Sequence, residues 1–172
     1  MTWAAGSLRI EPLGVSHDRQ AFDCGVASLN RYLREQSSQD MRRAMVRVFV
    51  AVPVDQDARI LGFFTLSAAT ITTVDLPPEL ARRLPRYPVP AALIGRLAVD
   101  QSVAGQGVGS LLLAAAVGKA RLAAETVAMM AMVVDPIDEA ARGFYAAFGF
   151  CSLLGLEQRM FLMLPCSGRP SS

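Results

Sequence analysis

Residues 93–113 read LIGRLAVDQSVAGQGVGSLLL and carry more structural information than any other stretch of this chain. The apolar run Leu93–Val99 is typical of a strand, and the aliphatic residues after the turn predict a helix over 107–124. Glycine occupies alternate positions of the turn: Gly105, Gly107 and Gly109. A backbone without Cβ atoms lets a ligand approach closely, and the first amides of a helix have no intrahelical partners. The stretch therefore predicts a pyrophosphate-binding turn.

Outward from this turn, hydrophobic periodicity and turn residues predict the order β-α-β-β-β-α-β-α-β-β. The predicted strands are 8–13, 46–54, 59–73, 93–99, 126–134, 150–154 and 158–164, and the predicted helices are 26–44, 107–124 and 135–148. Prolines make residues 75–90 a loop or a short helix. These elements predict a single α/β domain over 1–165 and a flexible tail over 166–172.

Composition limits the classes of protein that this chain can be. It has 172 residues, of which 52% are hydrophobic, so it is long enough to bury a core. No apolar run reaches the roughly 18 residues of a membrane span, and the N-terminus lacks the pattern of a signal peptide. The three cysteines fit no metal spacing. We therefore expect a cytoplasmic protein with free thiols, no bound metal and no membrane partner.

Arginine supplies 16 of the 17 basic residues, although the net charge is only +2. Two groups of arginines stand out: Arg31, Arg34, Arg42, Arg43 and Arg47, and then Arg82, Arg83 and Arg86. Arginine makes planar, bidentate contacts with phosphate, so these groups indicate a polyanionic partner such as RNA. A codon bias toward arginine and a solvated helix face would explain the same pattern without a partner.

The glycine turn fits one nucleotide-binding pattern better than two others. The dinucleotide fingerprint requires glycine where Ser110 stands, and a Walker A loop requires a lysine that the turn lacks. The turn resembles the acyl-coenzyme A loop of GCN5-related N-acetyltransferases (GNAT), Arg/Gln-x-x-Gly-x-Gly/Ala, except that Ala104 takes the first position. The resemblance implies a mixed, mostly antiparallel sheet flanked by helices, with the acyl-coenzyme A between the fourth and fifth strands. A tight turn without a ligand is the structural alternative.

A second segment, GFYAAFGF over Gly143–Phe150, resembles the late GNAT motif A-x-x-F-Y-x-x-x-G-F. On a helix, one apolar stripe would hold Ile137, Ala141, Phe144 and Phe148, with Tyr145 one step beside it. The resemblance implies that the Tyr145 hydroxyl points at the thioester sulfur and acts as the catalytic acid. A purely structural tyrosine is the alternative.

No residue of the sequence stands out as a general base. His17 is the only histidine, and we expect it on the surface or in a loop. A lysine amine, with a pKa of about 10.4, is almost fully protonated at neutral pH, whereas an α-amine titrates near 7.7–8.0. An acetyltransferase without an obvious base should therefore prefer an α-amine, such as that of an aminoacyl ester.

Three further segments resemble the acetyltransferase toxins of toxin–antitoxin modules: FDCGVASLNRYLREQ (22–36), ILGFFTLSAATI (60–71) and PVPAALIGRLAVDQSVAGQGVG (88–109). The resemblance covers roughly residues 8 to 164. It implies a homodimer that uses acetyl-CoA to acetylate the α-amine of aminoacyl-tRNA, stops translation, and is neutralised by a cognate ribbon-helix-helix antitoxin. It also implies a set of acetyl-CoA contacts: Leu97, Ala98, Val99, Ala104, Gly105, Gln106, Gly107, Gly109 and Ser110.

Arg47, Arg86 and Arg96 are weaker candidates, either for RNA phosphate or for the edge of the active site. Arg96 could equally brace its strand. Two other functions stay open at this point. One is acetylation of a small-molecule amine or a protein lysine, and the other is a non-catalytic acyl-coenzyme A sensor, which the departure at Ala104 would allow. The sequence does not specify which tRNA or amino acid is chosen.

Overall fold

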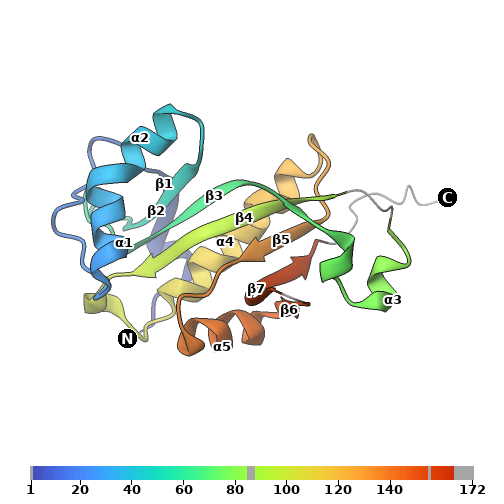
Figure 1. The fold of residues 1–172 in the computed structure, drawn as a ribbon. Coiled ribbons are helices and arrows are strands. Elements are labelled where there is room, and N and C mark those ends of the chain that lie inside the picture. The colour runs from blue at the N-terminus through green and yellow to red at the C-terminus, as the bar shows by residue number, and fades with distance from the viewer. Residues whose placement is uncertain (1, 85–87, 155, 165–172) are drawn as a thin grey trace. The chain divides into compact units, whose positions relative to one another are not determined.

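The structure is a computed structural model that describes residues 2–84, 88–154 and 156–164 (Figure 1). Its strands are β1 (Leu8–Pro12), β2 (Arg47–Pro53), β3 (Gly62–Ile71), β4 (Val89–Val99), β5 (Ala131–Val134), β6 (Cys151–Leu153) and β7 (Leu156–Met163). Its α-helices are α1 (Ala27–Arg31), α2 (Ser37–Arg42), α3 (Pro78–Ala81), α4 (Val108–Ala123) and α5 (Glu139–Phe148). Shorter segments are η1 (Ala5–Ser7), η3 (Thr73–Asp75) and η4 (Gln101–Val103), with a π-helical segment, η2 (Tyr32–Gln36).

The seven strands form one mixed sheet in the order β1-β2-β3-β4-β5-β7-β6. The pairs β1–β2, β2–β3, β5–β7 and β6–β7 are antiparallel, whereas β4 and β5 are parallel. The β4–β5 register runs from Ala91 opposite Ala131 to Ile94 opposite Val134, and β4 then continues to Val99. The predicted α/β class with a mixed, mostly antiparallel sheet is confirmed.

The first of two compact units comprises Met1–Ser67 and Gly95–Ala116. Its core forms because the apolar side of the helical segment α1–η2 packs on strands β2 and β3. Leu33 and Phe63 are fully buried there, and Phe22 meets Phe63 edge to face with ring centroids 5.5 Å apart. This unit contains the whole glycine turn and the end of β4.

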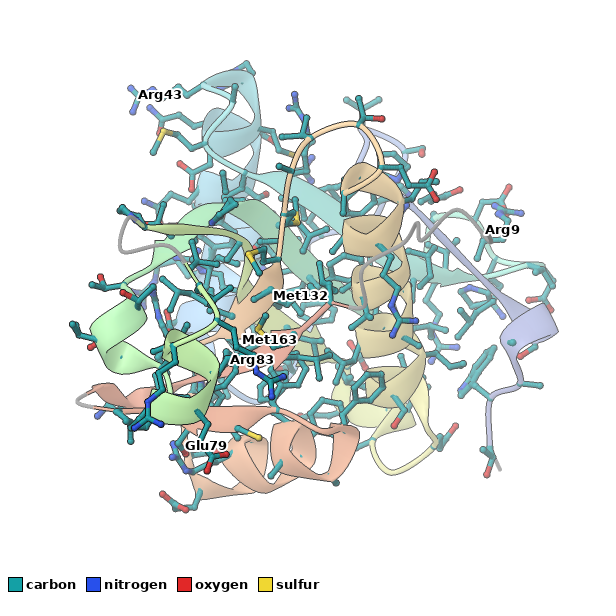
Figure 2. All side chains as sticks on the ribbon, turned by 90° about the vertical axis from the view of Figure 1, so that its right-hand side faces the viewer. Arg9, Arg43, Glu79, Arg83, Met132 and Met163 are labelled. Atoms are coloured by element: carbon teal, nitrogen blue, oxygen red, sulfur yellow. The ribbon has the colours of Figure 1, made fainter. Side chains whose placement is uncertain are left out.

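The second unit comprises Ala68–Ile94 and Val117–Ser172. Its core joins β4, β5 and β7 with the segment around η3, where Leu76 is almost fully buried. Figure 2 shows Met132 and Met163 on the neighbouring strands β5 and β7, and Glu79 and Arg83 at the surface of α3 and the turn after it. This unit contains α5 and therefore Tyr145.

Two predicted boundaries around β5 are wrong. The strand begins at Ala131 rather than at Thr126, because the amides of Thr126 and Val127 both bond to the carbonyl of Ala123 and prolong the end of α4. The following helix begins at Glu139, because the Asp138 side chain accepts the Ala141 amide at 2.8 Å and caps it. The prediction placed the strand too early because it relied on the apolar run 126–134, and the helix too early because it started the helix at Asp135 and Pro136.

The helix predicted over 26–44 is interrupted. It consists of α1, the π-helical η2 and α2, and the Ser37 hydroxyl donates to the carbonyl of Leu33 at 2.7 Å inside this segment. A serine that bonds back to the preceding turn competes with the regular ladder, and single π turns often occur at functional sites. The segment ends at Ala44, whose φ of +56° lies in the left-handed region.

Candidate active site

The turn before α4 is built by the aspartate of the LAVD segment. One carboxylate oxygen of Asp100 accepts the Ser102 amide at 2.9 Å and the Ser102 hydroxyl at 2.6 Å, and the other accepts the Asp23 amide at 3.0 Å. Burial raises the pKa of Asp100, but these donors lower it more, so the pKa lies below its ordinary value. Asp100 therefore stays ionised and fixes the exit of β4.

The glycines of the turn adopt conformations that other residues avoid. Gly105 has φ of +73° and Gly107 has φ of +85°, both in the left-handed region. A Cβ placed on Gly105 would meet no atom within 4 Å, so the space beside this glycine is open. The helix begins at Val108, and the first amide bonded back to the turn is that of Leu111, at 3.2 Å from the carbonyl of Gly107.

These features fit a diphosphate. The first residues of α4 are Val108, Gly109 and Ser110. The backbone amides at the start of a helix have no intrahelical acceptor, so they can donate to an anion. Ala104, Gly105, Gly107 and Ser110 are exposed, whereas Gln106 and Gly109 are half-buried. The turn residues predicted for the pyrophosphate thus lie together around the start of α4.

Trp3 contacts this turn, which the sequence analysis did not predict. Its backbone amide donates to the carbonyl of Gln106 at 2.9 Å, and its indole Nε1 donates to Oε1 of the same glutamine at 3.0 Å. Thr2 also lies close, with its Cγ2 3.5 Å from the Cβ that Gly107 would carry. No local pattern could have indicated these contacts, because the two segments are far apart in the chain.

The predicted acyl-arm residues lie on the end of β4. Ala98 is buried, and Leu97 and Val99 are half-buried. A Cβ on Gly62 would come within 2.7 Å of the Ala98 carbonyl, so β3 approaches β4 closely at this point. The three residues therefore lie at the end of β4, which Asp100 and η4 connect to the glycine turn.

Arg96 is held against the protein rather than extended into solvent. Its guanidinium carbon lies 3.6 Å from the centroid of the Tyr32 ring, and its backbone amide donates to Oγ1 of Thr65 at 3.1 Å. The Tyr32 hydroxyl donates to Asp40 at 3.0 Å. Burial and the bond to Asp40 raise the pKa of Tyr32 to about 12. This geometry supports the interpretation of Arg96 as a brace between β4 and η2.

The other predicted arginines divide into two kinds. Arg47, at the start of β2, is exposed, as are Arg31, Arg42 and Arg43 on and after the helical segment before it. Arg34 instead turns inward and donates to the backbone carbonyls of Arg19 and Phe22. Arg86 lies outside the described residues.

The segment FDCGVASLN forms a hydrogen-bonded turn that begins α1. Asp23 accepts the Gly25 amide and the Asn30 side-chain amide, both at 2.9 Å, and the Asn30 oxygen accepts the Cys24 amide at 2.9 Å. Gly25 has φ of +84°. The Gly25 amide and the Asn30 amide hold the pKa of Asp23 below its usual value. The motif thus joins the start of α1 to the Asp100 turn, because Asp23 also bonds to Asp100 and Gln101.

Tyr145 is the buried residue of α5, with 6% of its surface exposed. The predicted apolar stripe is wrong, because Ile137 precedes the helix and is 61% exposed, and Phe148 is 39% exposed. The Tyr145 ring packs edge to face on Phe144 and Phe150, with centroids 5.3 and 5.6 Å away. Burial raises the pKa of Tyr145 well above its ordinary value, so the hydroxyl keeps its proton.

His17 lies in the loop after β1, as one of the two expected placements has it, but it is buried rather than on the surface. The Gly14 amide donates to Nδ1 at 2.9 Å, which leaves Nε2 as the nitrogen that carries the proton and donates to Glu11 at 2.8 Å. The His17 ring therefore connects the loop after β1, through Gly14, to β1 itself, through Glu11.

Within the described ranges, no helix is long and apolar enough to cross a membrane. The same residues contain no group of three or more histidine, cysteine, aspartate or glutamate side chains placed to hold a metal ion.

The chain belongs to the acetyltransferase (GNAT) family, whose model matches residues 20–150. A curated relative, the tRNA-acetylating toxin of Mycobacterium tuberculosis, is 35% identical over 133 residues, which are 77% of this chain and 78% of the relative.

Three solved structures are similar over nearly the whole chain. The crystal structure of a tyrosine-to-phenylalanine mutant of KacT has a TM-score of 0.87 and 30% identity, covering 92% of this chain and 95% of KacT. AtaT complexed with acetyl-methionyl-tRNA has a TM-score of 0.85 and 30% identity, covering 91% and 94%. A tyrosine-to-phenylalanine mutant of AtaT, bound to acetyl-CoA and the C-terminus of the antitoxin AtaR, has a TM-score of 0.77 and 28% identity, covering 91% and 93%.

Proposed function

We propose that this GNAT acetyltransferase is a toxin that transfers the acetyl group of acetyl-CoA to the α-amine of aminoacyl-tRNA and thereby blocks translation. The observation that carries the proposal is the likeness to AtaT in complex with acetyl-methionyl-tRNA, which extends over more than nine-tenths of both chains. The relative from Mycobacterium tuberculosis, which is named for tRNA acetylation, supports the same acceptor.

Acetyl-CoA binds at the glycine turn and along the end of β4. The amides at the start of α4 and the backbone around Gly105 and Gly107 receive the diphosphate, because the turn is open there and offers donors without intrahelical partners. Leu97, Ala98 and Val99 accept the pantetheine arm on the part of β4 that lies beyond its pairing with β5. Ala104 contributes backbone only.

Bound acetyl-CoA supplies an acetyl thioester. The amine nitrogen forms a bond to the acetyl carbon, the bond from that carbon to sulfur breaks, the amine loses a proton and the sulfur gains one. Tyr145 supplies the proton to the sulfur. Its buried hydroxyl, whose pKa burial raises, stays protonated at neutral pH and can donate as a positioned acid. The tyrosine-to-phenylalanine mutants of KacT and AtaT also draw attention to a single tyrosine hydroxyl in those proteins.

At neutral pH a larger share of an α-amine than of a lysine amine is unprotonated and ready to attack. His17 is occupied on both ring nitrogens, so it does not serve as a free base. An α-amine with a pKa near 7.7–8.0 needs less help than a lysine with a pKa of about 10.4. The exposed arginines Arg31, Arg42, Arg43 and Arg47 bind the phosphates of the tRNA, while Arg96 braces the strand.

The partners follow from the same likeness. AtaT is bound by the antitoxin AtaR in a matched structure, and we propose that a ribbon-helix-helix antitoxin neutralises this chain in a similar way. We also propose a homodimer and a cytoplasmic location, where charged tRNA is available. We also propose a single GNAT domain over 1–165; the tail expected over 166–172 lies outside the described residues.

The test is acetyl transfer from labelled acetyl-CoA to a full set of charged tRNAs. Label should appear in the RNA fraction when the tRNA is aminoacylated, and should be absent when the same tRNA has been deacylated. Transfer that needs no RNA and labels polyamines or protein lysines would reject the proposed acceptor while keeping the acetyltransferase. No transfer to any acceptor would reject both.

A further inference from the structure

The N-terminal segment reaches the glycine turn and holds one of its side chains. Trp3 makes two hydrogen bonds to Gln106, from its backbone amide at 2.9 Å and from its indole at 3.0 Å. Trp3 and Gln106 are both half-buried, and Thr2 lies beside Gly107. The segment 2–3 is therefore part of the wall of the turn.

We propose that Trp3 is a positioning residue for acetyl-CoA, which orients the Gln106 carboxamide so that its NH2 group donates to the diphosphate. This inference rests on the proposed use of acetyl-CoA, and it adds to that function a residue from outside the glycine motif. Trp3 itself does not touch the ligand in this account.

The chemistry of the two side chains fixes the orientation. An indole N–H can only donate, so the Gln106 atom that faces it must be the carbonyl oxygen Oε1. The carboxamide then directs Oε1 toward Trp3 and keeps Nε2, with two N–H donors, for another partner. A diphosphate only accepts hydrogen bonds. Without the indole, the carboxamide could rotate and present an oxygen that the anion repels.

The composition of the turn makes the Gln106 carboxamide important. Residues 104–109 read AGQGVG, and Gln106 is the only one of these six residues whose side chain has polar atoms. Ala104 stands where the resembled pattern has arginine or glutamine, so that position offers the diphosphate no side-chain donor. Gln106, held by Trp3, supplies a side-chain donor two residues later.

Three variants separate the donor from the contact that orients it. Trp3→Phe keeps an aromatic ring but removes the indole N–H. Gln106→Glu keeps an acceptor for Trp3, and therefore keeps the segment anchored, but removes the Nε2 donors. Gln39→Glu makes the same change of charge at an exposed residue of α2 and serves as the matched control.

Calorimetry with acetyl-CoA measures the dissociation constant of each variant. Trp3→Phe should weaken binding about three- to tenfold, the effect of one hydrogen bond. Gln106→Glu should weaken it further, because a carboxylate repels the diphosphate, and Gln39→Glu should bind like the wild type. In a Gln106→Ala background, Trp3→Phe should have no further effect, because the carboxamide that it orients is gone.

Fluorescence gives a second measure, since Trp3 is the only tryptophan of the chain. Its emission should change with acetyl-CoA along the same saturation curve that calorimetry gives, and the change should shrink in Gln106→Ala. The inference is overturned if Trp3→Phe binds like the wild type, or if its loss is equally large without the Gln106 carboxamide. A wild-type protein that does not bind acetyl-CoA at all would instead reject the proposed function.

Discussion

Single residues in the first unit show how buried polar groups set the conditions under which the fold is stable. The buried Tyr32 ring, at the start of η2, lies under the Arg96 guanidinium. Its hydroxyl donates to Asp40. A tyrosine so placed resists ionisation, since its charged form would lose water and face a carboxylate. Its pKa of about 12 records this resistance.

This shift predicts a loss of stability at alkaline pH. An unfolded tyrosine ionises near a pKa of about 10, whereas folded Tyr32 holds its proton until about 12. Between these values the unfolded chain binds fewer protons, so the free energy of unfolding falls as the pH rises, and below this window Tyr32 contributes no pH dependence. Urea unfolding between pH 8 and about 11 should show a shallower decline for Tyr32→Phe than for the wild type. Parallel curves would contradict the buried, protonated Tyr32.

Tyr145 makes a different prediction, about rate rather than stability. Tyr145→Phe keeps the ring contacts to Phe144 and Phe150 and removes only the proton donor. Because general acids typically contribute 100-fold or more, kcat should fall by about that factor. The dissociation constant for acetyl-CoA, measured by calorimetry, should stay within about twofold of the wild type. A variant with full kcat would remove Tyr145 from the chemistry.

At the scale of elements, helix ends rather than helix interiors determine where the site residues lie. Gly149 ends α5 with φ of +114°, and the Phe150 amide then bonds to the carbonyl of Tyr145 at 3.1 Å. The same kind of conformation at Gly105 and Gly107 allows the chain to turn from β4 into α4. These turns could be predicted from the sequence, because glycine at a positive φ is a local property of a turn or a helix end.

Replacing glycine by alanine should change the stability in opposite directions at Gly143, inside α5, and at Gly149, just after it. Gly143 is exposed inside the helix, and a Cβ there would meet no atom within 4 Å, so Gly143→Ala should raise stability by about 0.5–1 kcal/mol. Gly149→Ala should lower it by about 1–2 kcal/mol, because alanine is strained at a positive φ although Leu162 leaves it room at 3.6 Å. Urea unfolding at pH 7 measures both. The same sign for both variants would contradict the helix end described here.

What the sequence could not indicate depends on contacts between distant segments. The turn, the strand before it and the α/β class were all predictable from glycine spacing and apolar periodicity. The bond from Trp3 to Gln106 and the stacking of Arg96 on Tyr32 were not, because nothing local marks a partner far along the chain. The inward side of α5 was also misjudged, since Tyr145 is buried while the predicted stripe residue Ile137 is exposed.

For the whole molecule, the acidic neighbours of each exposed arginine predict which arginines contact RNA. Figure 2 shows Arg43 and Arg9, both exposed in the first unit. Arg9 is paired with Asp57 at 2.7 Å and with Glu11 at 3.5 Å, whereas the structure gives Arg43 no acidic partner among the described residues. The neighbouring carboxylates offset the positive potential around Arg9, so its net attraction for a phosphate is smaller than that of Arg43.

Binding of charged tRNA at several salt concentrations tests this difference. Arg43→Ala should reduce the slope of log K against log salt by about 1, because one phosphate contact and its released counterion are lost. Arg9→Ala should leave the slope unchanged. Equal slopes for Arg43→Ala and the wild type would place the RNA elsewhere on the surface.

The most direct measurement is the mass of the aminoacyl-adenosine that a nuclease releases from the 3′ end of charged tRNA after incubation with this protein and acetyl-CoA. We predict that this mass increases by one acetyl group on the α-amine of the amino acid. The acetylated fraction should be strongly reduced with Tyr145→Phe. An unmodified aminoacyl-adenosine for every charged tRNA, from a protein that binds acetyl-CoA, would contradict this prediction.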